Sequence, residues 1–150
     1  MKHLNFAIVV SRFNETITEK LLEGALQRFA ERKIPTKNIA VWHVPGAIEL
    51  PIIAQQLAKQ RRYQAILCLG AVVRGETDHY DYVCQQVSYG CQRVALDHDI
   101  PVIFGLLTTD NEEQAFDRVG GRHGHKGSDC ADTAIEMADC IEMLISSSKQ

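Results

Sequence analysis

The chain has 150 residues, a formal net charge of −3 and a charged fraction of 23%, so neither disorder nor a nucleic-acid-binding surface is indicated. This length can bury a core of useful size, and we expect a single domain over residues 1–150. The first residues run directly into a strand pattern and no apolar run could span a bilayer, so we expect neither a secretion signal nor a membrane partner.

In chain order, apolar runs at residues 6–10, 39–44, 65–73 and 100–107 predict four strands. The first run is continuous rather than alternating, which is typical of a strand covered on both faces. Apolar residues at helical intervals follow each strand, and a last helix is expected from about Asp129. Strands that alternate with helices predict an α/β fold, a three-layer sandwich around a four-stranded parallel sheet.

Local signals suggest where two of these helices begin. Thr16 and Glu19 have the spacing of a capping box at the start of the first helix. Asp110 and Glu113 repeat that spacing before a short helix that ends near residue 119. The apolar side chains expected to face inward from the helices include Ile52 and Ile145.

The cysteines are odd in number and widely spaced, and they match neither a disulfide framework nor a zinc motif. Because they fall on apolar faces of the expected elements, we predict buried reduced thiols. Such thiols indicate a reducing compartment, and the cytoplasm is the expected location. The five are Cys68, Cys84, Cys91, Cys130 and Cys140.

The loop after the third strand has the composition of an anion-binding turn. Gly75 permits backbone angles that other residues avoid, so the amides of Glu76 and Thr77 can turn toward an anion. His79 follows, and a histidine can exchange a proton near neutral pH. A surface histidine would be the simpler interpretation, but a position beside an anion-binding turn favours a proton-transfer role.

The ends of the first two strands should lie at the same edge of the sheet as this loop, because parallel strands share a carboxyl side. They carry Phe13 in the segment Arg12-Phe13-Asn14 and Glu49 in the segment from Pro45 to Glu49. Phe13 could instead be a core anchor, and Glu49 a solvated residue of a helix first turn. Together with the loop, they predict a site for a planar polar ligand and a phosphate.

A metal site is the main rival interpretation. Asp78, His79 and Asp81, or the pair His123 and His125, could supply ligands. Asp78 and His79 are adjacent in the sequence, and the pair His123 and His125 has no evident third ligand. Neither group has a recognised metal-ligand spacing, so no metal is expected.

Residues 120–127, with the sequence GGRHGHKG, contain neither common phosphate-binding motif and are expected to form a flexible connection between helices. Arg118 precedes this loop and is a candidate bidentate partner for a phosphate. Because Arg118 follows the fourth strand, the sequence does not decide whether it reaches the loop after the third strand within one subunit. Arg118 of a neighbouring subunit would be able to reach that loop.

The sequence resembles the 6,7-dimethyl-8-ribityllumazine synthase family. The resemblance is collinear from Ile8 to about Ala138. The motifs that carry the resemblance are RFN at 12–14, VPGAIE at 44–49, LGAVVRGETDHY at 69–80 and PVIFG at 101–105, with Arg118 and Lys126-Gly127 as extensions.

The resemblance implies a flavodoxin-like fold and a transferase that acts on small-molecule substrates. It would condense 5-amino-6-(D-ribitylamino)uracil with 3,4-dihydroxy-2-butanone 4-phosphate, releasing phosphate and water, in the penultimate step of riboflavin biosynthesis. No redox change occurs in this reaction, so no metal or organic cofactor is expected.

The resemblance also implies roles for individual residues. His79 would be the proton donor, and the backbone amides of Glu76 and Thr77 would hold the phosphate with Arg118 of an adjacent subunit. The residues implied on the pyrimidine and ribityl side are Phe13, which stacks on the ring, Ala47, Ile48 and Glu49 at the ribityl chain, Ala71, Val72 and Val73 through backbone groups, and Phe104 in the uracil pocket.

Members of the family form pentamers, and many assemble the pentamers into an icosahedral shell. Here the arm before the first strand is short, and residues 120–127 differ from the GTKAGNKG common in shell-forming members. We therefore expect a homopentamer rather than a shell, with riboflavin synthase as a candidate partner. Ile48 and His43 also replace commoner residues, which concerns the detail of the pocket and not the reaction.

Two other function classes stay open at this stage. A flavin- or nucleotide-binding module of the same fold would keep the aromatic residue and the anion-binding loop without turnover, but it would not need His79. A metal-dependent hydrolase would require stoichiometric metal and would lose activity with a chelator.

Overall fold

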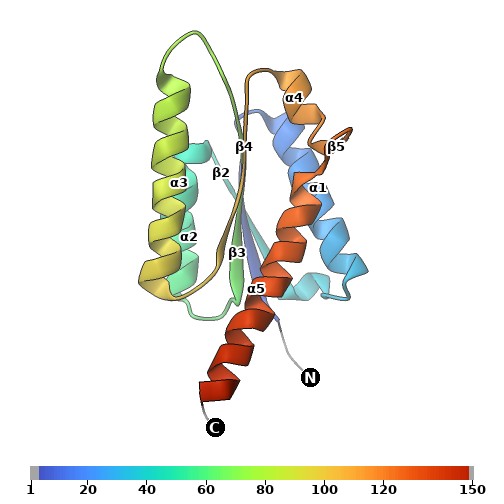
Figure 1. The fold of residues 1–150 in the computed structure, drawn as a ribbon, viewed down its shortest axis with the longest axis vertical. Helices are drawn as coiled ribbons and strands as arrows, with labels where there is room; N and C mark the ends of the chain where they lie inside the picture. The colour runs from blue at the N-terminus through green and yellow to red at the C-terminus, as the bar shows by residue number, and fades with distance from the viewer. Residues whose placement is uncertain (1–3, 149–150) are drawn as a thin grey trace.

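A computed structural model describes residues 4–148, and four parallel strands lie at its centre (Figure 1). Their bounds are β1 Phe6–Ser11, β2 Ile39–Val44, β3 Ala65–Val73 and β4 Val102–Thr109. They stand in the order β2-β1-β3-β4, so the two fully apolar runs occupy the centre of the sheet. The predicted α/β fold with a four-stranded parallel sheet is confirmed.

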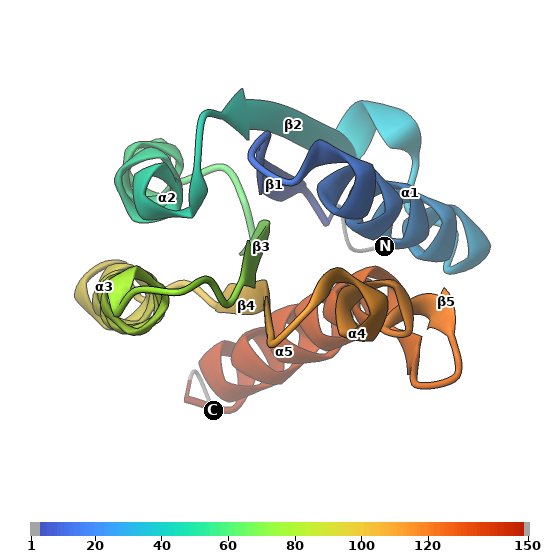
Figure 2. The same ribbon diagram turned by 90° about the horizontal axis from the view of Figure 1, so that it is seen from above.

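Helices cover both faces of the sheet, which makes the three layers visible from above (Figure 2). Helices α1 (Glu15–Glu31) and α5 (Lys126–Ser148) pack together on one face, and α2 (Leu50–Lys59) and α3 (His79–His98) pack together on the other. The short elements in the connections are η1 Thr36–Asn38, η2 Ala47–Glu49, α4 Glu112–Phe116 and the antiparallel pair β5 Val119–Gly121 and β6 Gly124–His125.

The register of the strands creates a step at the carboxyl edge of the sheet. Ser11 ends β1 opposite Val44 at the end of β2, whereas Val10 already pairs with Leu69 of β3. Strand β3 therefore continues for residues 70–73 beyond its pairing with β1, and there it pairs with β4. This step leaves space above the ends of β1 and β2 and beside the end of β3.

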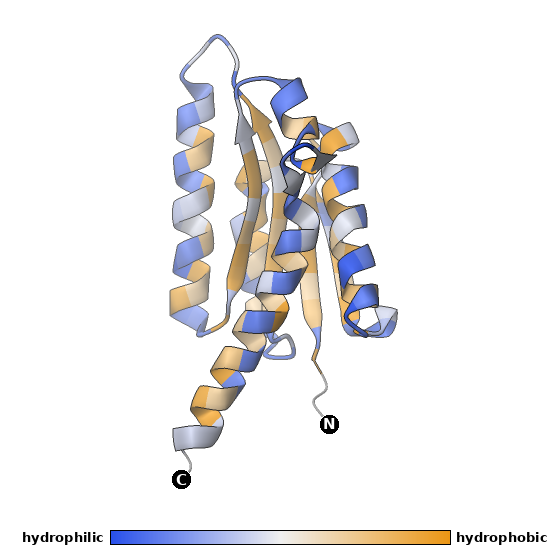
Figure 3. Ribbon diagram, turned by 45° about the vertical axis from the view of Figure 1, so that its right-hand side comes forward, coloured by the Kyte–Doolittle hydropathy of each residue, from blue (hydrophilic) through white to orange (hydrophobic). Residues whose placement is uncertain are grey.

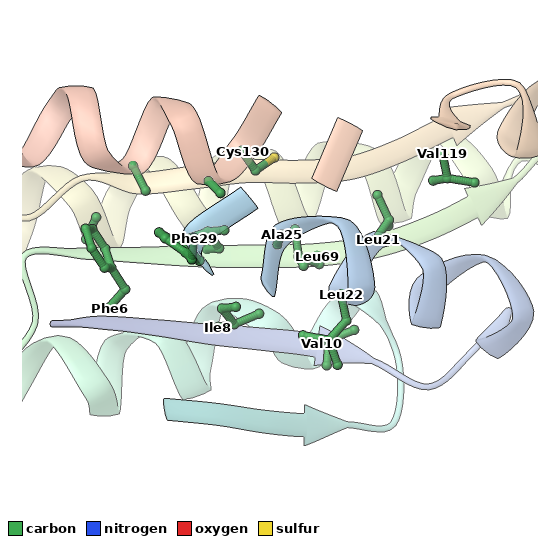
Figure 4. Packing of buried hydrophobic residues seen from close by; sticks show 14 of the residues in the cluster. Phe6, Ile8, Val10, Leu21, Leu22, Ala25, Phe29, Leu69, Val119 and Cys130 are labelled. Carbon is green, nitrogen blue, oxygen red and sulfur yellow. The ribbon is translucent and has the colours of Figure 1, made fainter. Parts of the chain in front are cut away.

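Two apolar clusters fill the space between the layers, and hydrophobic colouring follows the strands and the inward sides of the helices (Figure 3). The larger one lies between the sheet and α1 and α5, where the rings of Phe6 and Phe29 stack with centroids 4.8 Å apart (Figure 4). The second lies toward α2 and α3 and includes Leu50 and Val87. Alternate residues of β1 supply both clusters, which explains its unbroken apolar sequence.

Both predicted capping boxes are wrong by one or two residues. Helix α1 starts after Asn14, whose left-handed backbone (φ 63°) makes the sharp turn out of β1, so Thr16 is not the cap. Helix α4 is capped by Asn111, whose side-chain oxygen accepts a hydrogen bond from the Gln114 amide at 2.9 Å. In both cases the turn out of the preceding strand sets the start of the helix, and sequence spacing alone did not reveal it.

Two side chains expected to face inward are exposed. Ile52 is 53% exposed, because adjacent positions on a helix point about 100° apart and Ile53 takes the inward position. Ile145 is 52% exposed, because the last turns of α5 extend past the end of the sheet (Figure 1). Among the cysteines, Cys68, Cys91 and Cys130 are buried as predicted, but Cys84 is only partly buried and Cys140 is exposed.

None of the helices within residues 4–148 is both long and apolar enough to cross a membrane.

Candidate active site

A cavity of about 390 Å³ occupies the step at the carboxyl edge of the sheet. Its walls come from the segments that follow β1, β2 and β3 and from the first turns of α3. The lining residues are Phe13, Gly46, Ala47, Ile48, Glu49, Ala71, Val72, Val73, Gly75, Thr77, His79, Tyr80 and Val83.

The turn after β1 holds an aromatic ring over this cavity. The ladder between β1 and β2 continues past both strands, because the amides of Arg12 and Phe13 donate to the carbonyls of Val44 and Pro45 at 2.8 and 3.0 Å. The Phe13 side chain is nevertheless 70% exposed, so its ring is not a core anchor. A rigid main chain with a solvent-facing ring is suited to stacking on a planar ligand.

Asn14 joins the first wall of the cavity to the third. Its side-chain amide donates to the carbonyl oxygen of Ala71 at 2.9 Å, at the point where β3 has lost β1 as a neighbour. This bond replaces a missing ladder bond and fixes the end of β3 relative to Phe13. No signal in the sequence marked Asn14 for this role.

The turn after β2 fixes a carboxylate at the cavity. The residues 47–49 form one turn of 3-10 helix, and the carboxylate of Glu49 accepts a hydrogen bond from the Gly46 amide at 2.9 Å. Pro51 sits in the first turn of α2, as predicted, where no amide donor is needed. Glu49 is therefore held in place by its own turn and can present its other oxygen to a polar ligand.

The loop after β3 arches over the edge of the sheet to α3 and presents unused amide donors (Figure 1). Within residues 4–148, no backbone acceptor is recorded for the amides of Gly75, Glu76, Thr77 or Asp78. The hydroxyl of Thr77 accepts a hydrogen bond from the His79 amide at 3.3 Å, which anchors the start of α3. Free amides at the N-terminus of a long helix are a favourable site for an anion.

The side chains of this loop carry mostly negative charge. Glu76, Asp78 and Asp81 are exposed acids, and Arg74 is already engaged. Its guanidinium donates to Asp110 at 3.0 Å, lies 3.8 Å from Asp81 and stacks 4.2 Å from the centre of the Tyr80 ring. The hydrogen bond to Asp110 raises the pKa of Arg74. A bound anion must therefore rely on backbone amides and on a cation from outside the loop.

The structure brings together most, but not all, of the predicted site residues. Those that line the cavity are Phe13, Ala47, Ile48, Glu49, Ala71, Val72, Val73, Thr77 and His79. Glu76 lies in the loop between two lining residues, with an exposed side chain.

Phe104 and Arg118 do not line the cavity of their own chain. Phe104 pairs with Cys68 well before the end of β4 and is 37% exposed. Arg118 is exposed between α4 and β5, on the opposite side of the sheet from α3 (Figure 2). Tyr80 and Val83 line the cavity although only a helical stripe was predicted for them, because the first turn of α3 overhangs the end of the sheet.

Within the described chain, no three His, Cys, Asp or Glu side chains are grouped so that they could hold a metal ion. His79 and His125 lie on different elements, at the start of α3 and in β6.

Comparison with known proteins points to one family. A sequence model of the 6,7-dimethyl-8-ribityllumazine synthase family matches residues 3–142. A protein of the same name from the Dugway strain of Coxiella burnetii is 60% identical over 138 residues, which cover 92% of this chain and 91% of the relative. The proteins of that name from two further Coxiella burnetii strains match with the same identity and coverage.

Proposed function

The chain belongs to the 6,7-dimethyl-8-ribityllumazine synthase family, and we propose that the cavity beside β3 is where it makes 6,7-dimethyl-8-ribityllumazine. The reaction condenses 5-amino-6-(D-ribitylamino)uracil with 3,4-dihydroxy-2-butanone 4-phosphate and releases phosphate and water. One observation carries the assignment. A single cavity combines an exposed aromatic ring, a fixed carboxylate, unpaired amides and a histidine.

Each substrate has a matching part of the cavity. We assign the pyrimidine ring to the face of Phe13 and the ribityl chain to Ala47, Ile48 and Glu49, where a fixed carboxylate can accept hydroxyl hydrogen bonds. Backbone groups of the residues 71–73 meet the polar edge of the ring. The phosphate of the second substrate is assigned to the amides of Glu76 and Thr77.

The chemistry consists of proton transfers between bound partners. The amine of the uracil substrate attacks the ketone to form an imine, phosphate is eliminated, and the resulting enol closes the second ring. His79 lies on the cavity wall next to the amides assigned to phosphate, which supports the role we assign to it in moving protons during imine formation and elimination. Holding the two substrates side by side supplies a further part of the rate.

We assign Arg118 and Phe104 to the cavity of a neighbouring copy, because neither lines the cavity of its own chain. The acidic loop needs a cation from outside, and within residues 4–148 no carboxylate forms an ion pair with Arg118. Exposed apolar side chains at Tyr82, Tyr89 and Leu96 recur every seven residues on α3, which favours contact with another copy.

We propose a homopentamer in the cytoplasm as the working assembly, with a shell of pentamers as the alternative form. The buried reduced thiols Cys68, Cys91 and Cys130 support a reducing compartment. Riboflavin synthase, which would use the product, is the partner protein to test by co-purification.

The test is direct assay of both products. The purified protein mixed with both substrates should form a fluorescent lumazine and free phosphate in equal amounts, without added metal. Replacing His79 with Asn should lower kcat by roughly 10²-fold while the Kd for the uracil substrate changes little, because proton transfer acts in the transition state.

A matched control is His98→Asn, at the other end of the same helix and outside the cavity. It should retain the kcat of the unmodified enzyme. Product formation no faster than the uncatalysed reaction in the unmodified protein would overturn the proposed function. A His79→Asn variant with unchanged kcat would overturn only the role of His79.

A further inference from the structure

The imidazole of His125 caps the N-terminus of α5. His125 directly precedes the helix, and its Nδ1 atom accepts hydrogen bonds from the amides of Gly127 at 3.1 Å and Ser128 at 3.4 Å. A helix leaves its first amides without partners, and a side chain at this position normally satisfies them with an oxygen atom. Here a titratable nitrogen performs that function.

The ring occupies a space that exists only because two neighbouring residues are glycines and have no side chain. A Cβ atom at Gly24 of α1 would coincide with the His125 ring, and one at Gly127 would collide with the Leu21 backbone and approach the ring. The hydroxyl of Ser128 also donates to the Gly24 carbonyl at 3.2 Å, at the same crossing. The imidazole is thus packed between α1 and α5, partly exposed, and cannot rotate away without opening this contact.

Only the neutral imidazole can serve as this cap. A nitrogen that accepts hydrogen bonds carries no proton, whereas the imidazolium ion has donors at both nitrogens. Protonation at Nδ1 would direct an N–H group at two other N–H groups and place a positive charge at the positive end of the helix.

The surroundings of the ring also favour the neutral form. Burial is the largest influence, and it lowers the pKa of His125 below its ordinary value, with Arg28 of α1 acting in the same direction. Asp129 of α5, Glu23 of α1 and a hydrogen bond to the Lys20 backbone oppose this shift. The partner strand β5 has the sequence VGG and adds no titratable group.

The same cap holds the main chain around Arg118. His125 pairs with Val119 across the β5–β6 hairpin, and the amide of Lys126, the first residue of α5, donates to the Arg118 carbonyl at 2.7 Å. The Arg118 amide in turn donates to Ala115 at the end of α4 at 3.1 Å. Two contacts therefore connect His125 to the backbone of Arg118. They are the strand pairing with Val119 and the hydrogen bond from Lys126.

We propose that neutral His125 is a positioning residue for Arg118, and that its protonation weakens capture of the phosphate-bearing substrate. This inference rests on the proposed role of Arg118 in holding that phosphate. Because the folded state disfavours the imidazolium, the cap contributes fully above the ordinary pKa of 6.5 and is lost as the pH falls through the lower folded-state value. The loss should raise KM for the phosphate substrate more than it lowers kcat.

The test compares His125→Asn with the unmodified enzyme and with His123→Asn. Asparagine accepts the same amide hydrogen bonds but does not titrate. His123 is an exposed neighbour in the same hairpin and makes a matched control. KM for 3,4-dihydroxy-2-butanone 4-phosphate would be measured between pH 5.5 and 8, and the ratio of unmodified to variant KM removes the titration of the substrate and of other groups.

For His125→Asn this ratio should be near one at pH 8 and rise as the pH falls below 6.5, approaching roughly 3- to 10-fold once the imidazole is protonated, which is the size of effect expected for loss of one cap. The ratio for His123→Asn should stay flat. A flat ratio for His125→Asn as well would overturn the proposal.

Two further measurements separate the possible failures. If Arg118→Ala leaves KM for the phosphate substrate unchanged, the proposed role of Arg118 fails. The cap itself is read without activity, by a titration of the His125 ring and the Gly127 and Ser128 amides in NMR spectra of the unmodified protein. These amide signals should shift together with the ring, and independent titration of ring and amides would overturn the cap whether or not the variants fold.

Discussion

At the scale of single residues, the site depends on side chains that touch no substrate. Arg74 illustrates this, because its guanidinium bridges Asp110 at the end of β4 and Asp81 in α3 while it covers Tyr80. Its amide also donates to the Thr109 carbonyl at 2.8 Å. These contacts hold the start of the loop whose free amides we assign to phosphate.

Replacing Arg74 with Gln should therefore raise KM for the phosphate substrate by roughly 1.5- to 5-fold and change kcat less. The effect is modest because Arg74 and its partners are about half exposed, and exposed ion pairs contribute only about 0.2–1 kcal/mol. A double-mutant cycle with Asp110→Asn measures the coupling.

Arg93→Gln is a matched control. Arg93 makes similar contacts within α3, where it pairs with Asp97 and faces the Tyr89 ring, but it lies away from the cavity. Equal KM values for the Arg74 and Arg93 variants would show that the loop keeps its geometry without the bridge.

At the scale of secondary structure, the crossing of α1 and α5 is set by glycine. Gly24→Ala should destabilise the protein by about 1–3 kcal/mol, because the added methyl group overlaps the His125 ring in a closed contact. Chemical denaturation with urea measures this loss.

The change in stability caused by Gly24→Ala should have the opposite sign when the His125 ring is removed. In a His125→Ala background the three atoms nearest to the added methyl group are absent, so the same substitution should gain helix propensity, which is worth roughly 0.5–1 kcal/mol. Comparable destabilisation in both backgrounds would contradict the assigned packing of the imidazole.

The four strands and the main helices followed from apolar periodicity, because burial on one or both faces dictates that pattern. The hairpin of β5 and β6 could not be predicted in this way. Its strands contain only three and two residues with no alternation, and it depends on contacts with α1 and α4 that no local signal encodes.

The same reasoning explains which site residues were predictable. Phe13, Glu49 and His79 follow strands directly, so topology alone brought them together. The bond from Asn14 to Ala71 joins residues 57 positions apart, and it depends on the left-handed turn after β1 and on the unequal lengths of β1 and β3. The role of His125 depended on the glycine-lined crossing of two helices.

At the scale of the whole molecule, one copy of the chain does not complete the site that we propose. The cavity holds the acidic loop and His79, while Arg118 and Phe104 lie outside it. The protein also exposes apolar side chains away from the cavity, including Met143 and Leu144 in the part of α5 that extends beyond the sheet (Figure 3). Both features have one explanation if neighbouring copies cover these surfaces and contribute Arg118.

Subunit mixing tests this explanation. His79→Asn and Arg118→Ala each remove one half of the proposed site, so each pure assembly should have low activity at a limiting concentration of the phosphate substrate. Dissociating and reassembling an equal mixture creates interfaces where an intact His79 meets an intact Arg118. With random association in a ring, about one quarter of the interfaces have this composition, so roughly a quarter of the original activity should return.

Combining the two pure assemblies without dissociation controls for carry-over and should restore nothing. Light scattering before and after mixing tests whether the assembly is a pentamer, for which the ring statistics hold. If both residues act within one chain, every subunit of the mixture carries a defect and activity stays low. That result would place Arg118 in the cavity of its own subunit and would require the hairpin of β5 and β6 to cross the edge of the sheet.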